Sequence, residues 1–406
     1  MKSLWSTLRY GSSGFDLRDL LFKLCAYLQR KPLLILRENP QACTRVLAAS
    51  DRKGAFLERL LAAPAWLPIY SIESEDGERW EELAVTCQQI LAHCNWQANI
   101  PSLVKREVSE TAALLSKSAK IFDGEQVARL SLRVLSDCLF EQPLSPDDEG
   151  LFYRASLEWR REIAIKSRGD TVIKKQFVAR LASLIQKSKF AAAFAAEEGT
   201  RSLVLSAIAQ PFILSPQINV SDIFAATYSF LLNDPLLYQQ VQQEARKGNH
   251  AYLEGVLFEA IRLKHPFPIL ERELTKTMVI EGKDYPPGTQ VFILLDQLKQ
   301  EREFKPERWL NPESAALYAG LIFGAGRRLC LGKGLARLLL RELLREVLVQ
   351  LPLDQVQPQQ GHLYSGRDND KPSFGESCYQ IRKFAGAIAA SYVLGSKKNR
   401  GCPLQR

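Results

Sequence analysis

Most of the chain shows the spacing of apolar residues that is typical of amphipathic helices. From residue 80 to about 189, apolar residues recur at every third or fourth position. Ser221 is expected to cap a later helix, and Asp234 with Pro235 to end it. The pattern predicts helices over residues 127–140, 158–187 with a break near Gly169 and Asp170, 190–209, 221–232 and 253–263.

The pattern changes after residue 270. Over 271–298, β-branched runs alternate with turn residues, which predicts two or three short strands. An apolar run within 31–39 suits a buried strand, and a helix is expected over 335–351. The predicted fold is therefore mainly α with a small β region. We expect one domain over 1–395, followed by a basic, disordered tail over 396–406.

The composition is that of an ordinary globular protein. Of 406 residues, 46% are hydrophobic and 24% are charged, which excludes disordered, collagen-like and disulfide-scaffold proteins. The eight cysteines are dispersed without a C-x-x-C pair, so we expect reduced thiols. No histidine lies three to five positions from another, which argues against a histidine metal site. We see neither a signal peptide nor a transmembrane anchor, and expect a cytoplasmic protein.

The net charge of +9 could indicate nucleic acid, an anionic membrane or an acidic protein as partner. No helix-turn-helix spacing, zinc pattern or aromatic RNA-binding motif supports a nucleic-acid partner. Part of the charge forms a row with a spacing of four residues, which places it along one helix face. This row consists of Lys333, Arg337, Arg341 and Arg345. A solvated helix face is the ordinary explanation of such a row.

The strongest local signal is the glycine-rich loop FGAGRRLCLG at 323–332. Its glycines allow close approach to a flat ligand and positive φ angles. The following helix N-terminus and the adjacent arginines are expected to lower the pKa of Cys330. A thiolate is one of the few protein groups that can bind heme iron. The alternative is a structural cysteine beside a phosphate-binding loop, but the P-loop spacing is absent.

This loop satisfies F-G-x-G-x-R-x-C-x-G at every fixed position and therefore resembles the signature of the cytochrome P450 family. The resemblance implies that Cys330 is the axial ligand of the iron in heme b. It also implies that Arg328 binds a heme propionate and that Phe323 packs beside the sulfur. Gly326 and Gly332 would give the loop its shape.

Other motifs of the resemblance lie upstream of the loop. Glu259 and Arg262 form an E-x-x-R pair, which by itself is more often a solvated pair. Together with the later PERW segment it resembles the family's structural cluster of Glu259, Arg262 and Arg308. Arg272 would be a second propionate contact.

A further motif, DGERW at 76–80, resembles a helix start of the family in which Trp80 donates its indole N–H to a propionate. A core aromatic is the alternative for Trp80. Position 84 is alanine where the family has arginine, which leaves Arg79 as the substitute.

The sequence departs from the family in two places. The segment 299–303 is shortened, and the acid–threonine pair of the family's central helix is missing. Counting back from Pro235, that pair should lie near 215–219, where the chain reads SPQIN. Asn219 occupies the threonine position, as in family members that rearrange peroxides. Alternatively, Asn219 only bridges a helix broken at Pro216, or the register is shifted by a turn.

These features support two enzymatic hypotheses. The first is a soluble, bacterial-type monooxygenase that oxidises a small organic substrate, such as a secondary metabolite, with dioxygen and two electrons. An acidic ferredoxin or flavodoxin would then bind the basic row from Lys333 to Arg345. The second is a reductase-independent isomerase, dehydratase or peroxygenase that uses Asn219. A heme-binding protein without catalysis is a third, minor alternative.

Overall fold

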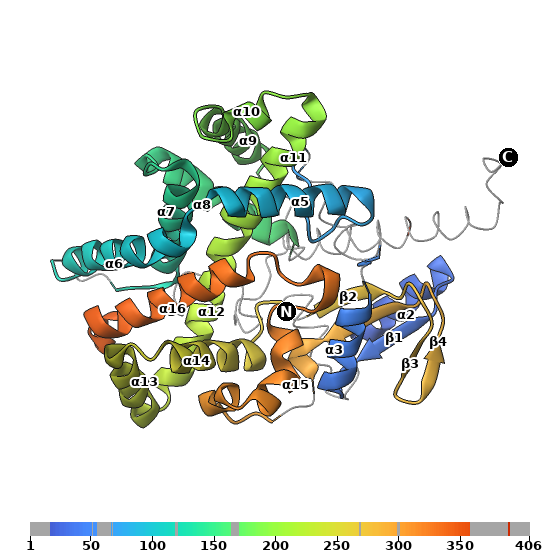
Figure 1. Cartoon of the computed structure of the whole chain (residues 1–406). Helices are drawn as coiled ribbons and strands as arrows, with labels where there is room; N and C mark the ends of the chain where they lie inside the picture. The colour runs from blue at the N-terminus through green and yellow to red at the C-terminus, as the bar shows by residue number, and fades with distance from the viewer. Residues whose placement is uncertain are drawn as a thin grey trace.

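A long central helix passes through the molecule, and other helices pack around it (Figure 1). It consists of α11 (Glu198–Ile208), a π-helical segment η2 (Ala209–Leu214) and α12 (Ser215–Leu232). The computed structural model describes residues 17–50, 52–54, 66, 68–117, 121–163, 170–267, 269–298, 301–357 and 389. The predicted tail over 396–406 lies outside these residues, and the single-domain assignment stays a prediction.

The helices of the first half agree with the predicted pattern. The helix expected over 127–140 is confirmed as α7, and Asp170 caps α9 by accepting hydrogen bonds from Val172 N and Ile173 N, at the expected break. This half contains α5 (Glu78–His93), α6 (Trp96–Leu115), α7 (Gly124–Phe140), α8 (Pro146–Ile163), α9 (Thr171–Gln186) and α10 (Ala191–Phe194).

The predicted start of a helix at Ser221 is wrong. Ser221 lies inside α12, fully buried, and its hydroxyl donates to the carbonyl of Gly124. The predicted stop is confirmed, because α12 ends at Leu232 and Asp234 caps the next helix. The Ser221 hydroxyl thus joins two helices rather than capping the end of one.

The prolines of the central helix produce a π-helical turn instead of a break. Pro211 and Pro216 have no N–H for the carbonyls four residues earlier, those of Ala207 and Phe212. The Cys87 thiol donates to the Ala207 carbonyl at 3.7 Å, and Ser215 N donates to the carbonyl of Gln210, five residues earlier. The helix therefore continues through both prolines with one widened segment.

Among the described residues, the next four helices are α13 (Pro235–Lys247), α14 (His250–Leu263), α15 (Pro312–Ile322) and α16 (Lys333–Gln350), with short 3-10 turns between some of them. Of these helices, α13, α14 and α16 pack against α12, and α15 packs against α14 and α3 (Pro40–Ala49). The predicted helix over 253–263 begins slightly earlier than expected, at His250. The predicted helix over 335–351 is confirmed and begins directly after the cysteine loop.

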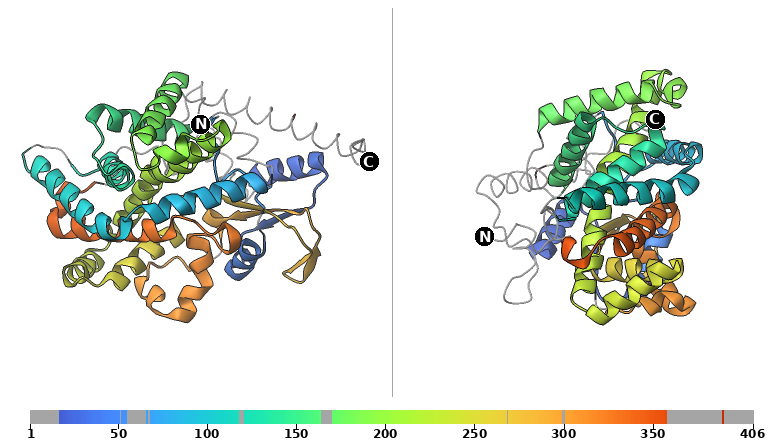
Figure 2. Two further views of the ribbon diagram at one scale, coloured as in Figure 1. Left: turned by 45° about the horizontal axis from the view of Figure 1, so that its top comes forward. Right: turned by 90° about the vertical axis from the view of Figure 1, so that its left-hand side faces the viewer.

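The strands lie at one side of the molecule, beside α2 (Leu17–Gln29) and α3 (Pro40–Ala49) (Figures 1 and 2). In the larger sheet the order is β1-β5-β2, with β1 (Leu33–Leu36) parallel and β2 (Ile269–Glu273) antiparallel to the fully buried β5 (Gln290–Leu294). A hairpin of β3 (Met278–Ile280) and β4 (Lys283–Tyr285) completes the predicted β region. The mainly α fold class with a small β region is thereby confirmed.

The core contains one extensive helical cluster and a smaller one between the sheet and α3. Within the described residues, one helix, Glu198–Leu231, is long and apolar enough to cross a membrane, but 72% of its most apolar window is buried inside the protein. That burial is the property of a core helix. Cys25, Cys43, Cys87, Cys94 and Cys138 are free and buried, as the composition predicted.

Candidate functional site

A cavity of about 420 Å³ lies between the central helix and the cysteine loop. Its wall is mostly apolar and includes residues of α5, α16 and the segment that joins α14 to β2. Ligand sites of proteins usually have about this size and character. The cavity brings three residues of the cysteine loop, Phe323, Arg328 and Cys330, together with Arg272 and Trp80, which lie far from the loop in the sequence.

The backbone of the cysteine loop fixes Cys330 at the cavity wall. Cys330 N donates to the carbonyl of Phe323 at 2.8 Å. Gly326 has a φ of 67°, and a Cβ there would lie 2.5 Å from the carbonyl oxygen of Ala48. Gly332 differs from the expectation of a positive φ, because it has a φ of −83° and immediately precedes α16. Of these two glycines, Gly326 alone has a backbone conformation that favours glycine.

The expected lowering of the Cys330 pKa is not what the structure shows. The residue is exposed to the cavity, yet the protein around the sulfur removes water and raises the pKa of the thiol to about 11. Glu73 adds to the rise, whereas the backbone of Gly332 and the charge of Lys333 oppose it. Arg328, which was expected to lower the pKa of Cys330, forms an ion pair with Asp76.

Arg328 is held by residues that precede α5. Its guanidinium donates to the Asp76 carboxylate and, at 2.6 Å, to the carbonyl of Glu75. Asp76 also accepts from the backbone N–H groups of Lys53 and Gly54, both at 2.9 Å. Asp76 thus connects the cysteine loop to a segment more than 250 residues earlier, while Arg328 still lines the cavity.

Arg272 is a buried cation with an unused donor. It is 5% exposed, and its Nε atom has no hydrogen-bond partner in the part of the chain that the structure describes, while Nη1 donates to the carbonyl of Glu271 at 2.8 Å. Burial and the neighbouring Arg328 lower the pKa of Arg272 to about 10. Two guanidiniums therefore meet at the cavity, and one of them has a free N–H.

Trp80 lines the cavity and is 8% exposed, with the guanidinium of Arg328 over its ring at 4.9 Å. Arg79 does not replace the missing arginine of position 84. It is exposed, stacks on Tyr70 at 4.2 Å from the ring centroid and is not part of the cavity wall. Lys53 is the additional cation at this wall.

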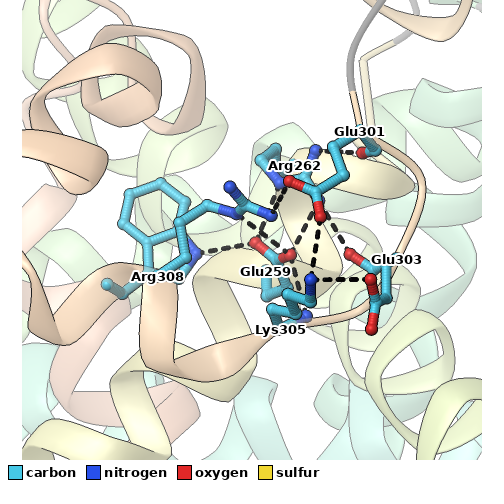
Figure 3. Close-up of polar contacts among 7 residues, drawn as sticks. Glu259, Arg262, Glu301, Glu303, Lys305 and Arg308 are labelled. Carbon is cyan, nitrogen blue, oxygen red and sulfur yellow. Dashed lines mark hydrogen bonds and ion pairs between the residues drawn. The ribbon is translucent and has the colours of Figure 1, made fainter.

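Glu259, Arg262 and Arg308 form a cluster behind the site (Figure 3). Arg262 donates to both carboxylate oxygens of Glu259, at 2.8 and 2.7 Å, and both side chains are fully buried. Arg308 Nε lies 3.4 Å from Glu259, and Trp309 Nε1 donates to it at 3.0 Å. Burial alone would raise the pKa of Glu259. The hydrogen bonds from Arg262, Lys305 N and Trp309 outweigh burial and lower this pKa.

The same cluster holds the shortened segment. Arg262 donates to the backbone carbonyls of Glu301 at 2.7 Å and Glu303 at 3.2 Å, and Arg308 binds the Glu301 carboxylate at 2.7 Å. Glu301 and Glu303, just before η4 (Pro306–Leu310), are thus attached directly to α14, while residues 299 and 300 of the shortened segment lie outside the described residues.

The basic row of α16 is largely matched by carboxylates. Arg337 and Arg341 both contact Glu254 on α14, and Arg345 contacts Glu342 and Glu346 at 3.0 and 2.6 Å. Arg341 also reaches Glu342 at 3.0 Å. Lys333 has no ion pair within the described part of the chain. The row is therefore no uniform stripe of positive charge, and only its first member is free of a carboxylate partner among the described residues.

Asn219 lies on the cavity wall contributed by the central helix. Its Oδ1 accepts from Arg160 at 3.3 Å, and its Nδ2 donates to the Ser215 hydroxyl at 3.0 Å. The contact with Ser215, one turn earlier, agrees with the alternative in which Asn219 bridges the distorted helix. Among the described residues, α12 contributes no carboxylate and no threonine to the cavity wall.

Comparison with known proteins identifies the family. The family model for cytochrome P450 matches residues 230–363. Cytochrome P450 93A3 of Glycine max is 27% identical over 207 residues, which is 44% of this chain and 39% of that protein. Cytochrome P450 4ae1 of Drosophila melanogaster is 36% identical over 106 residues, 24% of this chain and 21% of the relative. The chain belongs to the cytochrome P450 family.

The fold of this cytochrome P450 agrees with solved structures of the family. A six-coordinated cytochrome P450 from Thermus thermophilus matches with a TM-score of 0.57 and 19% identity, over 82% of this chain and 90% of that one. A zebra fish cytochrome P450 with abiraterone matches with a TM-score of 0.60 and 18% identity, over 82% and 91%. The sequence matches are shorter and span 39%, 22% and 25% of the first three curated relatives.

The family and the fold imply heme b as the cofactor of this cytochrome P450. The residues present fit that group. Cys330 offers a sulfur at the wall of an apolar cavity, and the unpartnered Nε of buried Arg272 is a donor suited to a carboxylate. Bound iron would also remove the proton that the surroundings otherwise hold on the Cys330 sulfur.

Several wall residues of the cavity carry no sequence motif that marks them. Lys53 and Glu73 have no motif around them, and His265 lies just beyond the helix expected over 253–263. Gln210 could have been found, because it directly precedes Pro211 in a helix with two prolines five positions apart.

Proposed function

We propose that the chain is a heme-thiolate monooxygenase that oxidises a small organic substrate with dioxygen and two electrons. The observation that carries the proposal is the cavity itself. It has Cys330 in one wall, the central helix in another, and mostly apolar side chains around the space between them. When bound, heme supplies the redox chemistry of oxygen activation.

The chain's own residues would hold the cofactor and exclude water. The Cys330 sulfur would bind the iron, and Arg272 and Arg328 would bind the propionates. The cluster of Glu259, Arg262 and Arg308 would keep the segment behind the loop in place and take no part in chemistry. The apolar wall favours an organic substrate over a charged one.

Proton delivery is the step for which this chain has unusual residues. The cavity wall of α12 offers the Ser215 hydroxyl and the Asn219 amide, neither of which is an acid. This observation favours a second candidate, a reductase-independent isomerase, dehydratase or peroxygenase. An amide can orient a peroxide oxygen without giving it a proton.

One experiment separates the candidates. The heme-loaded protein is mixed with organic hydroperoxides without reductant, and separately with NAD(P)H, a reductase system and dioxygen. Product only in the second mixture supports the monooxygenase, whereas product only in the first replaces it by the second candidate. A third outcome is that neither mixture gives product while the ferrous–CO complex absorbs at the Soret position typical of thiolate-ligated heme. That result would identify the chain as a non-catalytic heme-binding protein.

We propose further that the protein works in the cytoplasm and receives electrons from an acidic ferredoxin or flavodoxin. The site for this partner would lie where α16 begins, at Lys333, close to Cys330. Arg337, Arg341 and Arg345 of the predicted row are engaged with carboxylates and would contribute less.

Replacing Lys333 by Gln should slow reductase-supported turnover roughly fivefold at low salt, the effect of about 1 kcal/mol of charge attraction. The effect should shrink as salt is added. The ferrous–CO spectrum serves as the control for an intact heme site. Equal rates for both proteins at low salt would argue against this docking position.

A further inference from the structure

Gln210 is a buried polar side chain whose amide oxygen has no partner among the described residues. Gln210 is 2% exposed and lines the cavity, and no described donor reaches its Oε1 atom. Leaving a buried amide oxygen unpaired costs about 1–3 kcal/mol, so such atoms are rare and need an explanation. Leucine or methionine would fill the same position without that cost.

The cavity wall to which Gln210 belongs is mostly apolar. The segment η2 that carries it packs against α7 and α8, and the adjoining α11 packs against α5. Of these helices, α5 and α7 contribute Cys87, Leu91 and Leu135 to the cavity wall. The Cys87 thiol donates to the Ala207 carbonyl and so has its own acceptor. A hydrogen-bond donor for Gln210 would therefore come from a molecule inside the cavity.

A second glutamine on the same helix shows the contrast. Gln217 is fully buried, accepts a hydrogen bond from the Ser156 hydroxyl at 2.7 Å and does not line the cavity. Its amide oxygen connects α12 to α8, which is a structural use of a buried glutamine. Gln210 has no comparable contact. Each amide keeps one buried atom without a partner among the described residues, Oε1 of Gln210 and Nε2 of Gln217, but of these two glutamines Gln210 alone belongs to the cavity wall.

We propose that Gln210 is the anchor for a hydroxyl or N–H group of the substrate. The substrate class is then an otherwise apolar molecule with at least one hydrogen-bond donor. A hydroxyl would donate to the Gln210 oxygen, and the rest of the molecule would lie against the apolar wall. This inference rests on the proposed function only in assuming that the substrate enters this cavity.

The test measures equilibrium binding to the ferric, heme-loaded protein without reductant or peroxide. The probes are cyclohexanol, 1-octanol and 1-indanol, each paired with its methyl ether, and the readout is the change of the heme spectrum on titration. The wild-type protein should bind the alcohols about fivefold more tightly than the ethers, the effect of one hydrogen bond. Gln210→Leu and Gln210→Met should lose this preference.

Gln217→Leu is the matched control. It removes a buried amide from the same helix and should keep the preference for alcohols, because Gln217 does not line the cavity and the Ser156 hydroxyl retains the carbonyls of Phe152 and Ile213 as acceptors. Gln210→Met should unfold at the wild-type midpoint or above it.

Equal binding of alcohols and ethers by the wild type, or an unchanged preference in both Gln210 variants, would overturn the anchor. Turnover is not measured in this test. A protein with the preference but no monooxygenase activity would therefore disprove the proposed function alone, and an active enzyme without the preference would disprove the anchor alone.

Discussion

Gly326 and Gly332 stand on either side of Cys330 in the same signature, yet their surroundings predict opposite responses to alanine. Gly326→Ala places a side chain at a φ of 67° and only 2.5 Å from the Ala48 carbonyl. The conformation alone costs about 1–2 kcal/mol. We expect lower heme content and a lower unfolding midpoint, measured by absorbance and in urea.

The control for this prediction is Gly332→Ala. Gly332 has a φ of −83°, and an added Cβ would meet nothing nearer than the Cys330 sulfur at 4.0 Å. This variant should bind heme like the wild type. If Gly326→Ala did so too, the contact between the loop and Ala48 would not position Cys330.

Arg272 offers a second prediction at the residue scale, in which stability and cofactor binding change in opposite directions. Its buried charge lies beside Arg328 and has an unused Nε donor. Arg272→Met should stabilise the heme-free protein by about 1–2 kcal/mol, and should speed heme transfer to apomyoglobin about tenfold by removing a charge-assisted contact.

Arg328→Met provides the comparison, because it would leave half-buried Asp76 without its cation. We expect it to destabilise the heme-free protein by about 3–5 kcal/mol. A loss of stability in Arg272→Met of the same size would show that Arg272 is already paired in the heme-free fold.

Sequence reasoning found the residues whose identity is fixed by a motif, and missed the properties that depend on the fold. Cys330, Arg328 and Arg272 were found because their order along the chain is specific. The pKa of Cys330 was predicted in the wrong direction, because desolvation depends on all the protein around the sulfur and Arg328 is bound to Asp76. No local pattern contains that information.

At the scale of elements, the buried pair of Glu259 and Arg262 joins α14 to the segment that precedes η4. Glu259→Gln removes the charge that compensates Arg262 and replaces one of its two acceptor oxygens by an NH2 donor, so that Arg262 and Trp309 can no longer both keep their hydrogen bonds. We expect a loss of about 3–5 kcal/mol in the free energy of unfolding. Urea unfolding measures it.

The matched control is Glu301→Gln. Glu301 pairs with Arg308 at the protein surface, where water already screens the charges. Its replacement should leave the unfolding midpoint nearly unchanged. A small effect of Glu259→Gln would contradict the structural role that we assign to the cluster.

The central helix shows where sequence reasoning about elements failed. Ser221 was taken as a helix start because serine is common there, but Ser221 donates to Gly124 on another helix. Pro216 was expected to kink the helix or to begin a new one, and it does lie in the first turn of α12, but the helical path continues into it from η2. A break is avoided because the Cys87 thiol binds one freed carbonyl and a π-helical turn accommodates the rest. Both outcomes depend on contacts between distant segments.

At the scale of the whole molecule, buried titratable groups predict how stability depends on pH. Burial lowers the pKa of His265 to about 4, so the folded protein keeps this residue neutral while the unfolded chain takes up a proton below about pH 6.5. Unfolding then binds a proton, and stability should fall by about 3 kcal/mol as the pH drops from 6.5 to 4.

The His265 contribution can be isolated by urea unfolding between pH 4 and 8. His265→Gln should reduce the slope of the unfolding free energy against pH by the equivalent of about one proton per molecule. His93→Gln, at an exposed position of α5, is the control and should leave this slope unchanged. An unchanged slope in His265→Gln would mean that this histidine is protonated in the folded protein.

The same reasoning gives the alkaline limit of stability. Burial raises the pKa of Cys43, Cys87 and Cys138 to about 12, and these thiols ionise near pH 9 only in the unfolded chain. Unfolding then releases protons, so stability should decline as the pH rises from 9 toward 12. The maximum is expected between about pH 6.5 and 9.

The supports of the cysteine loop have a consequence for how the protein is made. Gly326 rests on Ala48, and Arg328 is bound to Asp76, so the loop depends on residues that leave the ribosome more than 250 positions earlier. Ala48 and Asp76 therefore lack their contacts with the loop until the loop has been synthesised. We therefore expect heme capture to follow synthesis of the loop, and chaperones to matter most while the amino-terminal half is waiting for it.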